Sequence, residues 1–125
     1  MRRCFDHIDL RVPDLAAATP FYSALLPALG FTRKMEIEGW LQYEADSAGI
    51  TEFFGVTEST EHRPNENRIA FRAASVAEIT RLAEIAAAAG ARNMEGPMHY
   101  EQGYHAVFFE DPFGNRLEIC HRVPA

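Results

Sequence analysis

The sequence repeats itself once, and this repeat constrains the fold more strongly than any other feature. An offset of 60 to 61 residues lays the second half of the 125-residue chain on the first. The coinciding positions are His7 and Arg68, Ile8 and Ile69, Leu10 and Phe71, Asp14 and Ser75, and Gly30 and Gly90. Duplicated units of this length bury a shared core. We therefore predict one domain over residues 1–125, built from module 1 (4–56) and module 2 (67–122) with a polar linker at 57–66.

Each half carries the hydrophobic spacing of a strand, a helix and three further strands. Ile8, Leu10 and Val12 alternate with polar residues, as in a half-buried strand. In the helix that follows, Pro20 removes a backbone hydrogen bond, so we expect a kink or a restart there. The expected helices lie between Asp14 and Gly30 and between Ser75 and Gly90, and the expected strands cover 5–12, 31–37, 40–45, 50–56, 68–72, 91–94, 103–110 and 115–122. This order predicts an α+β fold of two βαβββ modules.

The composition argues against a nucleic-acid or membrane partner. The net charge is −6 and the acidic and basic residues are interspersed, so a phosphate backbone would be repelled and no nucleic acid is expected. No apolar run is long enough to span a bilayer and no secretion signal is evident, so we expect no membrane partner and a cytoplasmic location. Cys4 and Cys120 are expected to be small buried thiols rather than a disulfide, because that compartment is reducing.

Asp111-Pro112-Phe113-Gly114 has the composition of a type I turn between two strands. With its flanks, from His105 to Ile119, this hairpin resembles the closing hairpin of the vicinal-oxygen-chelate superfamily of glyoxalases, bleomycin resistance proteins and extradiol dioxygenases. The opening stretch Asp6–Asp14, followed by Phe21-Tyr22 and Leu29-Gly30-Phe31, resembles the first strand and helix of the same superfamily. The resemblance implies curved mixed sheets around a cleft, a small-molecule ligand and a homodimer.

The superfamily builds a metal site from the first and last strands of each module, and the resemblance assigns three of its four positions. His7 matches the first-strand histidine, Glu118 the last-strand glutamate of module 2, and Glu52, to within one residue of register, the last-strand ligand of module 1. The two-residue period of a strand also turns His7 and Glu118 away from the helices. One nitrogen and several oxygens accept Zn, Ni, Co, Mn or Fe. The implied chemistry is Lewis-acid stabilisation of an oxygenated substrate, with Glu52 or Glu118 moving a proton, as in a lyase or isomerase.

Arg68 stands at the fourth position, where the superfamily pattern has a histidine. An arginine stays protonated and pairs with carboxylates, so it can neutralise Glu52 and Glu118 without a metal, or bind a carboxylate or phosphate of a substrate. Beside a divalent ion it would be repelled by about 4 kcal/mol per unit charge at about 4 Å. Three hypotheses stay open: a metal-assisted glyoxalase-like enzyme, a metal-free ligand-sequestering protein of the bleomycin-resistance type, and a metal-free enzyme using Arg68 with Glu52 or Glu118. Extradiol dioxygenase activity is disfavoured, because it needs two histidines.

Several further side chains are candidates for the cleft. In the superfamily, residues before the closing hairpin often line the pocket, which indicates Tyr100, Tyr104 and His105. His105 is a candidate general acid or base, or else a surface histidine. Trp40 and Phe54 are candidates for stacking on an aromatic ligand, or for core packing. The remaining histidines, interpreted as exposed or structural, are His62, His99 and His121.

Overall fold

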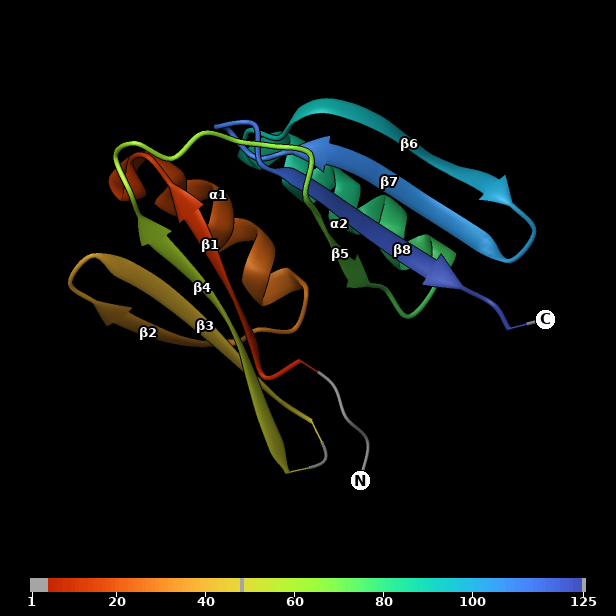
Figure 1. The fold of residues 1–125 in the computed structure, drawn as a ribbon. Coiled ribbons are helices and arrows are strands. Elements are labelled where there is room, and N and C mark those ends of the chain that lie inside the picture. The colour runs from red at the N-terminus through yellow and green to blue at the C-terminus, as the bar shows by residue number, and fades with distance from the viewer. Residues whose placement is uncertain (1–4, 48, 125) are drawn as a thin grey trace. The chain divides into compact units, whose positions relative to one another are not determined.

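The same succession of elements occurs twice along the chain. The computed structural model describes residues 5–47 and 49–124, and the chain divides into two compact units, 1–63 and 64–125. The first unit contains β1 (His7–Val12), α1 (Leu15–Ala28), β2 (Arg33–Ile37), β3 (Trp40–Ser47) and β4 (Ile50–Glu58). The second contains β5 (Arg68–Arg72), α2 (Val76–Ala89), β6 (Arg92–Glu101), β7 (Tyr104–Glu110) and β8 (Arg116–Arg122). The predicted α+β fold of two βαβββ modules is confirmed (Figure 1).

Each unit folds its four strands into one mixed sheet with a single helix along one side. The strand order is β1-β4-β3-β2 in the first sheet and β5-β8-β7-β6 in the second. In both sheets the first strand of the unit pairs in parallel with the last, and the other pairs are antiparallel. Helix α1 contacts β3 and β4, and α2 contacts β6, β7 and β8. Each sheet therefore has one face packed on a helix and one face without a helix of its own unit, which we call the open face.

Local side-chain chemistry fixes where the helices begin and end. At the start of α1, Asp14 accepts a hydrogen bond from the backbone N–H of Ala17 at 3.1 Å, and Ser75 accepts the equivalent bond from Glu78 at 3.1 Å. These bonds satisfy N–H groups of the first turn that have no partner inside the helix. At the end of α2, Gly90 has a φ of 114°, a conformation that costs glycine little and other residues more.

Several expected boundaries differ from the structure by one or more residues. Helix α1 runs through Pro20 without restarting, and β4 continues to Glu58, into the predicted linker. Strand β6 spans Arg92–Glu101 rather than 91–94, although it contains Gly96-Pro97. Because β6 lies at the edge of its sheet, a proline without an N–H is tolerated there, and the pairing of β6 with β7 shows register shifts along this stretch.

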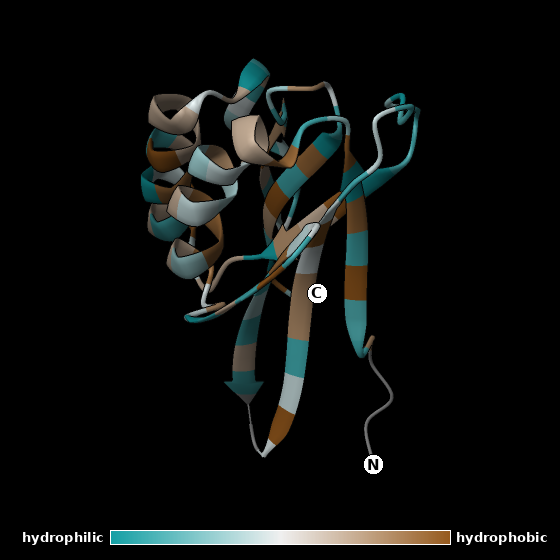
Figure 2. Cartoon of the chain, turned by 90° about the vertical axis from the view of Figure 1, so that its left-hand side faces the viewer, coloured by the Kyte–Doolittle hydropathy of each residue, from teal (hydrophilic) through white to brown (hydrophobic). Residues whose placement is uncertain are grey.

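Hydrophobic side chains alternate along the strands and meet the helices on one face of each sheet. Bands of hydrophobic and hydrophilic residues follow one another along the strands in Figure 2. In the first unit Phe54 and Val56 are buried in the core, and in the second Leu117 and Ile119 are buried opposite α2. The two-residue period of a strand then turns the residues between them towards the open face.

Two further expectations concern the thiols of the cysteines and the absence of a membrane-spanning segment. Cys120 is half-buried and carries a free thiol, whereas Cys4 lies outside the described residues. Within the part of the chain that the structure describes, neither helix is long and apolar enough to cross a membrane.

Candidate ligand-binding site

Glu118 is the carboxylate placed most deeply on the open face of the second sheet. It lies in β8 between Leu117 and Ile119, whose side chains are fully buried on the helix side. The strand period therefore turns Glu118 to the opposite face, as the sequence predicts. Only 7% of Glu118 is exposed, so its carboxylate needs a polar partner.

That partner is Tyr104 on the neighbouring strand, where the sequence led us to expect a cation. The Tyr104 hydroxyl donates a hydrogen bond to Oε2 of Glu118. Burial and this bond raise the pKa of Tyr104 to about 12. The guanidinium of Arg122 lies over the Tyr104 ring, 4.1 Å from the ring centre, in a cation–π contact. The pKa of the Cys120 thiol is also raised, mainly by burial and to a smaller extent by the negative charge of Glu118.

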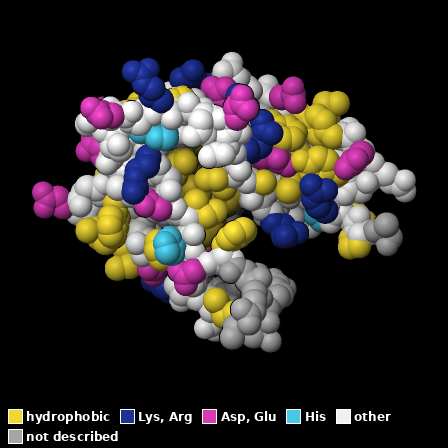
Figure 3. Space-filling view, in the orientation of Figure 1, with side chains coloured by type: hydrophobic (Ala, Val, Ile, Leu, Met, Phe, Trp, Pro, Cys, Tyr) yellow, Lys and Arg dark blue, Asp and Glu magenta, His cyan; other side chains and the backbone are white. Residues whose placement is uncertain are grey.

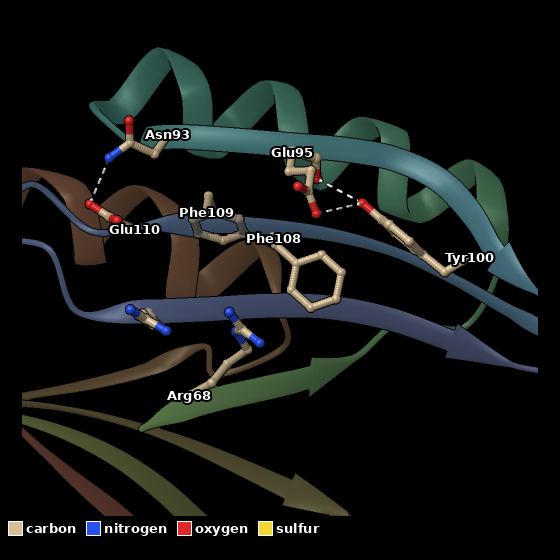
Figure 4. Close-up of a pocket in the computed structure, with 8 residues that line it drawn as sticks. Arg68, Asn93, Glu95, Tyr100, Phe108, Phe109 and Glu110 are labelled. Carbon is tan, nitrogen blue, oxygen red and sulfur yellow. Dashed lines mark hydrogen bonds between the residues drawn. The ribbon is translucent and has the colours of Figure 1, made fainter. Parts of the chain in front are cut away.

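A hollow of about 380 Å³ opens on the second unit. Its lining residues come from all four strands or the ends of them: Arg68, Asn93, Glu95, Tyr100, Phe108, Phe109, Glu110 and Arg116 (Figure 4). In the space-filling view, hydrophobic side chains gather over β6 to β8, with acidic and basic side chains around them (Figure 3). The sequence indicated Arg68 and Tyr100 as ligand-binding residues, and the structure brings these two together.

Two aromatic rings and a guanidinium line this hollow side by side. Arg68 reaches from β5 over the ring of Phe108, with its Cζ 4.8 Å from the ring centre (Figure 4). Tyr100 meets the same ring edge-on, at 5.2 Å between ring centres. The Tyr100 hydroxyl lies 3.4 Å from the carboxylate and the backbone carbonyl of Glu95, and this carboxylate contributes, after burial, to a raised pKa of Tyr100.

Two cations, Arg68 and Arg116, line the hollow. Glu110 is occupied elsewhere, because its Oε1 accepts a hydrogen bond from Asn93 at 3.0 Å and lies 3.7 Å from the guanidinium of Arg92. Among the described residues, no carboxylate forms an ion pair with Arg68 or Arg116. The positive charge of these two side chains is therefore available to an anion.

In the first unit His7 is packed against an aromatic ring. The imidazole of His7 stacks on Phe53 at 4.3 Å between ring centres and 3° between planes, and its Nδ1 lies 2.7 Å from the carboxylate of Asp6. A small hollow of about 110 Å³ adjoins this pair and also includes Trp40 and Gly55. Trp40 is therefore placed where a ligand could contact it.

Phe54 and Glu52 lie on the other face of β4. Phe54 is 1% exposed and packs against Tyr22, which agrees with its alternative interpretation as a core residue. His7 pairs with Phe53 in the sheet, so the side chain level with His7 on the open face is Phe53. Glu52 is one residue earlier and shares the face of Phe54. The structure therefore does not bring Glu52 and His7 together.

Comparisons with known proteins address the family. The model of the Glyoxalase/Bleomycin resistance protein/Dioxygenase superfamily matches residues 5–119. The chain belongs to this superfamily. None of the functionally curated proteins matches it significantly.

Solved structures of this superfamily share the fold over nearly the full chain. A glyoxalase/bleomycin resistance protein from Albidiferax ferrireducens T118 is 26% identical with a TM-score of 0.79, covering 95% of this chain and 98% of that one. The fosfomycin resistance protein FosX from Mesorhizobium loti is 20% identical with a TM-score of 0.68, over 98% and 95% of the two chains. FosX from Listeria monocytogenes, solved with Mn(II) and sulfate, is 22% identical with a TM-score of 0.69, over 98% and 93%.

Of the four positions at which the superfamily places metal ligands, two carry residues that cannot bind a cation in this chain. On β1 there is His7, but the residue level with it on β4 is Phe53. On β8 there is Glu118, held by Tyr104, and β5 carries Arg68 on the open face. Within the described residues no three His, Cys, Asp or Glu side chains are arranged to hold an ion. A phenylalanine and an arginine at two of four positions do not fit a divalent cation.

Three histidines form a cluster that the sequence analysis missed. His105 pairs with His99 across β6–β7 and with His121 across β7–β8, so all three share one face of the second sheet. His121 lies two residues after buried Ile119 and shares its face of the strand, so the row of histidines lies on the helix side and not on the open face. The pKa of His105 is lowered, mainly by partial burial and to a smaller extent by the charges of the other two imidazoles. The two hairpin turns, at Gln102-Gly103 and at Asp111–Gly114, were the signal that could have placed the three side by side.

Proposed function

We propose that this superfamily member binds a small organic anion in the hollow of its second unit, without a metal ion. The ligand would carry a carboxylate, phosphate or phosphonate together with a planar apolar part. The observation that carries this proposal is the Arg68 guanidinium, which lies over Phe108 in the hollow and has no carboxylate partner among the described residues.

The arrangement of the hollow supports this ligand chemistry. A guanidinium over an aromatic ring leaves its N–H donors free for other partners, and it binds carboxylate and phosphate oxygens in pairs. Arg116 adds a second positive charge, and the rings of Tyr100 and Phe108 offer apolar surface for the planar part of the ligand. The hollow is of the size at which small-molecule sites begin, about 300 Å³.

The superfamily includes metal-dependent and metal-free proteins, and the residues present favour the second kind. The Mn(II) of the Listeria FosX is not carried over, because Phe53 and Arg68 occupy two of the positions that would have to supply ligands. A ligand-sequestering role of the bleomycin-resistance type is therefore our first choice. A metal-free enzyme that uses Arg68 and Glu118 is the second, supported by the buried carboxylate on the same open face.

A binding measurement tests the proposal directly. Phenyl phosphate would be titrated calorimetrically into the purified protein in the presence of EDTA, with phenol as the uncharged analogue. We expect binding of phenyl phosphate but not of phenol, because a hydrogen bond to a charged group contributes about 1.5–3 kcal/mol. Arg68→Gln should therefore weaken binding by about 10-fold to 100-fold, and Arg68→Lys by less, since it keeps the charge and loses the paired donors.

Arg81→Gln is the matched control. Arg81 lies on the exposed side of α2, 3.8 Å from Glu78, and is remote from the open face. Equal weakening in Arg81→Gln and Arg68→Gln would contradict the proposal, and so would binding that EDTA abolishes. Turnover of phenyl phosphate, measured as the release of inorganic phosphate, would favour the metal-free enzyme over the ligand-sequestering protein.

We also propose that the protein is a cytoplasmic homodimer, as its superfamily implies. The support in the chain itself is a group of exposed hydrophobic side chains on and beside the first sheet: Met35, Ile37 and Trp40. Exposed apolar surface of this kind marks interaction sites. Light scattering at micromolar concentration would give twice the chain mass of 14.0 kDa if the proposal holds, and the single mass if it fails.

A further inference from the structure

Three imidazoles stand in a row on the helix side of the second sheet, on the face opposite the proposed anion site. In the pairing of the strands, His99 of β6 lies beside His105 of β7, and His105 lies beside His121 of β8. All three belong to one unit, and none of them takes part in the proposed function.

The rings of His99 and His105 are close enough for one nitrogen of each to bind the same proton or the same metal ion. Nδ1 of His99 and Nδ1 of His105 are 2.8 Å apart, and the ring centres are separated by 4.6 Å. Two neutral imidazoles can share a proton at this distance, and they can equally share a metal ion. Ligand nitrogens lie about 2.0–2.1 Å from an ion such as zinc, so the two nitrogens would need to separate by only a few tenths of an ångström.

His121 is oriented as metal-ligating histidines commonly are. Its Nδ1 donates a hydrogen bond to the backbone carbonyl of Ala73 at 3.0 Å. This bond fixes the tautomer and leaves Nε2 with a lone pair. As placed, the three side chains do not converge on one point, in line with the absence of any ready three-ligand group among the described residues. A third ligand bond therefore requires a rotation of His99 or His105, both of which are at least partly exposed.

We propose that His99 and His105 bind a divalent transition-metal ion, with His121 as a third ligand from the neighbouring strand. Imidazole nitrogens suit Zn²⁺, Ni²⁺ and Cu²⁺ rather than Mg²⁺ or Ca²⁺, which prefer oxygen. Water would occupy the remaining positions. This site is separate from the superfamily's metal positions, which lie on the open face, and it does not depend on the proposed anion binding.

Calorimetric titration of the apoprotein with Zn²⁺ and with Ni²⁺ tests the site. We expect one ion bound per chain, and an affinity reduced at least about tenfold in both His99→Ala and His105→Ala. His121→Ala should also bind more weakly. The matched control is His62→Ala, which changes a histidine in the first unit between β4 and β5 and should leave the affinity unchanged.

A second measurement keeps the test decisive if a variant folds poorly. Bound Zn²⁺ should raise the unfolding temperature of the unchanged protein and of His62→Ala, because an ion that binds only the folded state stabilises it, and should raise that of His105→Gln less. The proposal is overturned if neither ion binds the unchanged protein. It is equally overturned if His62→Ala loses as much affinity as His105→Ala.

Discussion

Replacing Tyr104 by phenylalanine should destabilise the protein by about 2 kcal/mol. The substitution removes one hydroxyl and leaves the ring, so the contact between the ring and Arg122 is retained. What is lost is the hydrogen bond to the carboxylate of Glu118, which is only 7% exposed. A hydrogen bond to a charged group contributes about 1.5–3 kcal/mol, and because Tyr104 is half-buried, water can partly replace it.

Tyr100→Phe is the control for the loss of a tyrosine hydroxyl on the same face. The Tyr100 hydroxyl has only long contacts of 3.4 Å, both to the exposed Glu95. We therefore expect a cost below about 0.5 kcal/mol, as for most surface changes. The free energies of unfolding would be obtained from urea titrations at pH 7, followed by circular dichroism.

A double-mutant cycle assigns the energy to the pair of side chains. If Tyr104 acts through Glu118, then Tyr104→Phe should cost less in a Glu118→Gln background, and the coupling should be about 1 kcal/mol or more. A cost for Tyr104→Phe no larger than that for Tyr100→Phe would refute this reasoning. So would additive effects in the cycle.

Two further predictions concern the same unit. The pKa of Tyr104 is raised from 10.0 to about 12, so its contribution to stability is fully present below pH 10 and is lost between pH 10 and about 12. In this range the tyrosine hydroxyl is ionised in the unfolded chain and still protonated in the folded protein. Tyr104→Phe should therefore reduce the loss of stability at alkaline pH, as measured by the free energy of unfolding. Asp111→Ala should cost about 3 kcal/mol and Asp111→Asn less, measured by thermal unfolding, because the fully buried carboxylate accepts hydrogen bonds from Phe113 and Asn115 that hold the β7–β8 turn.

The repeat and its periodicities predicted the order of strands and helices in both units. Alternation along β1 and β8 determines which residues face a helix, and Asp14 and Ser75 carry the capping chemistry of their helices in their own side chains. The closing turn at Asp111–Gly114 is equally local, and its hydrogen bond from the Gly114 N–H to the Asp111 carbonyl, 3.1 Å long, forms as its composition predicts. These features depend on a few neighbouring residues, so the sequence alone determines them.

The composition of the site depended on strand register, which the sequence leaves open. A shift of one residue separates Glu52 from Phe53, and the pairing of β1 with β4 places Phe53, not Glu52, level with His7. Register also assembled the pair of Tyr104 and Glu118 and the row His99, His105 and His121, whose members are up to 22 positions apart in the chain. A one-residue slip turns every side chain of a strand to the other face, so only the packed tertiary structure can decide which polar groups become neighbours.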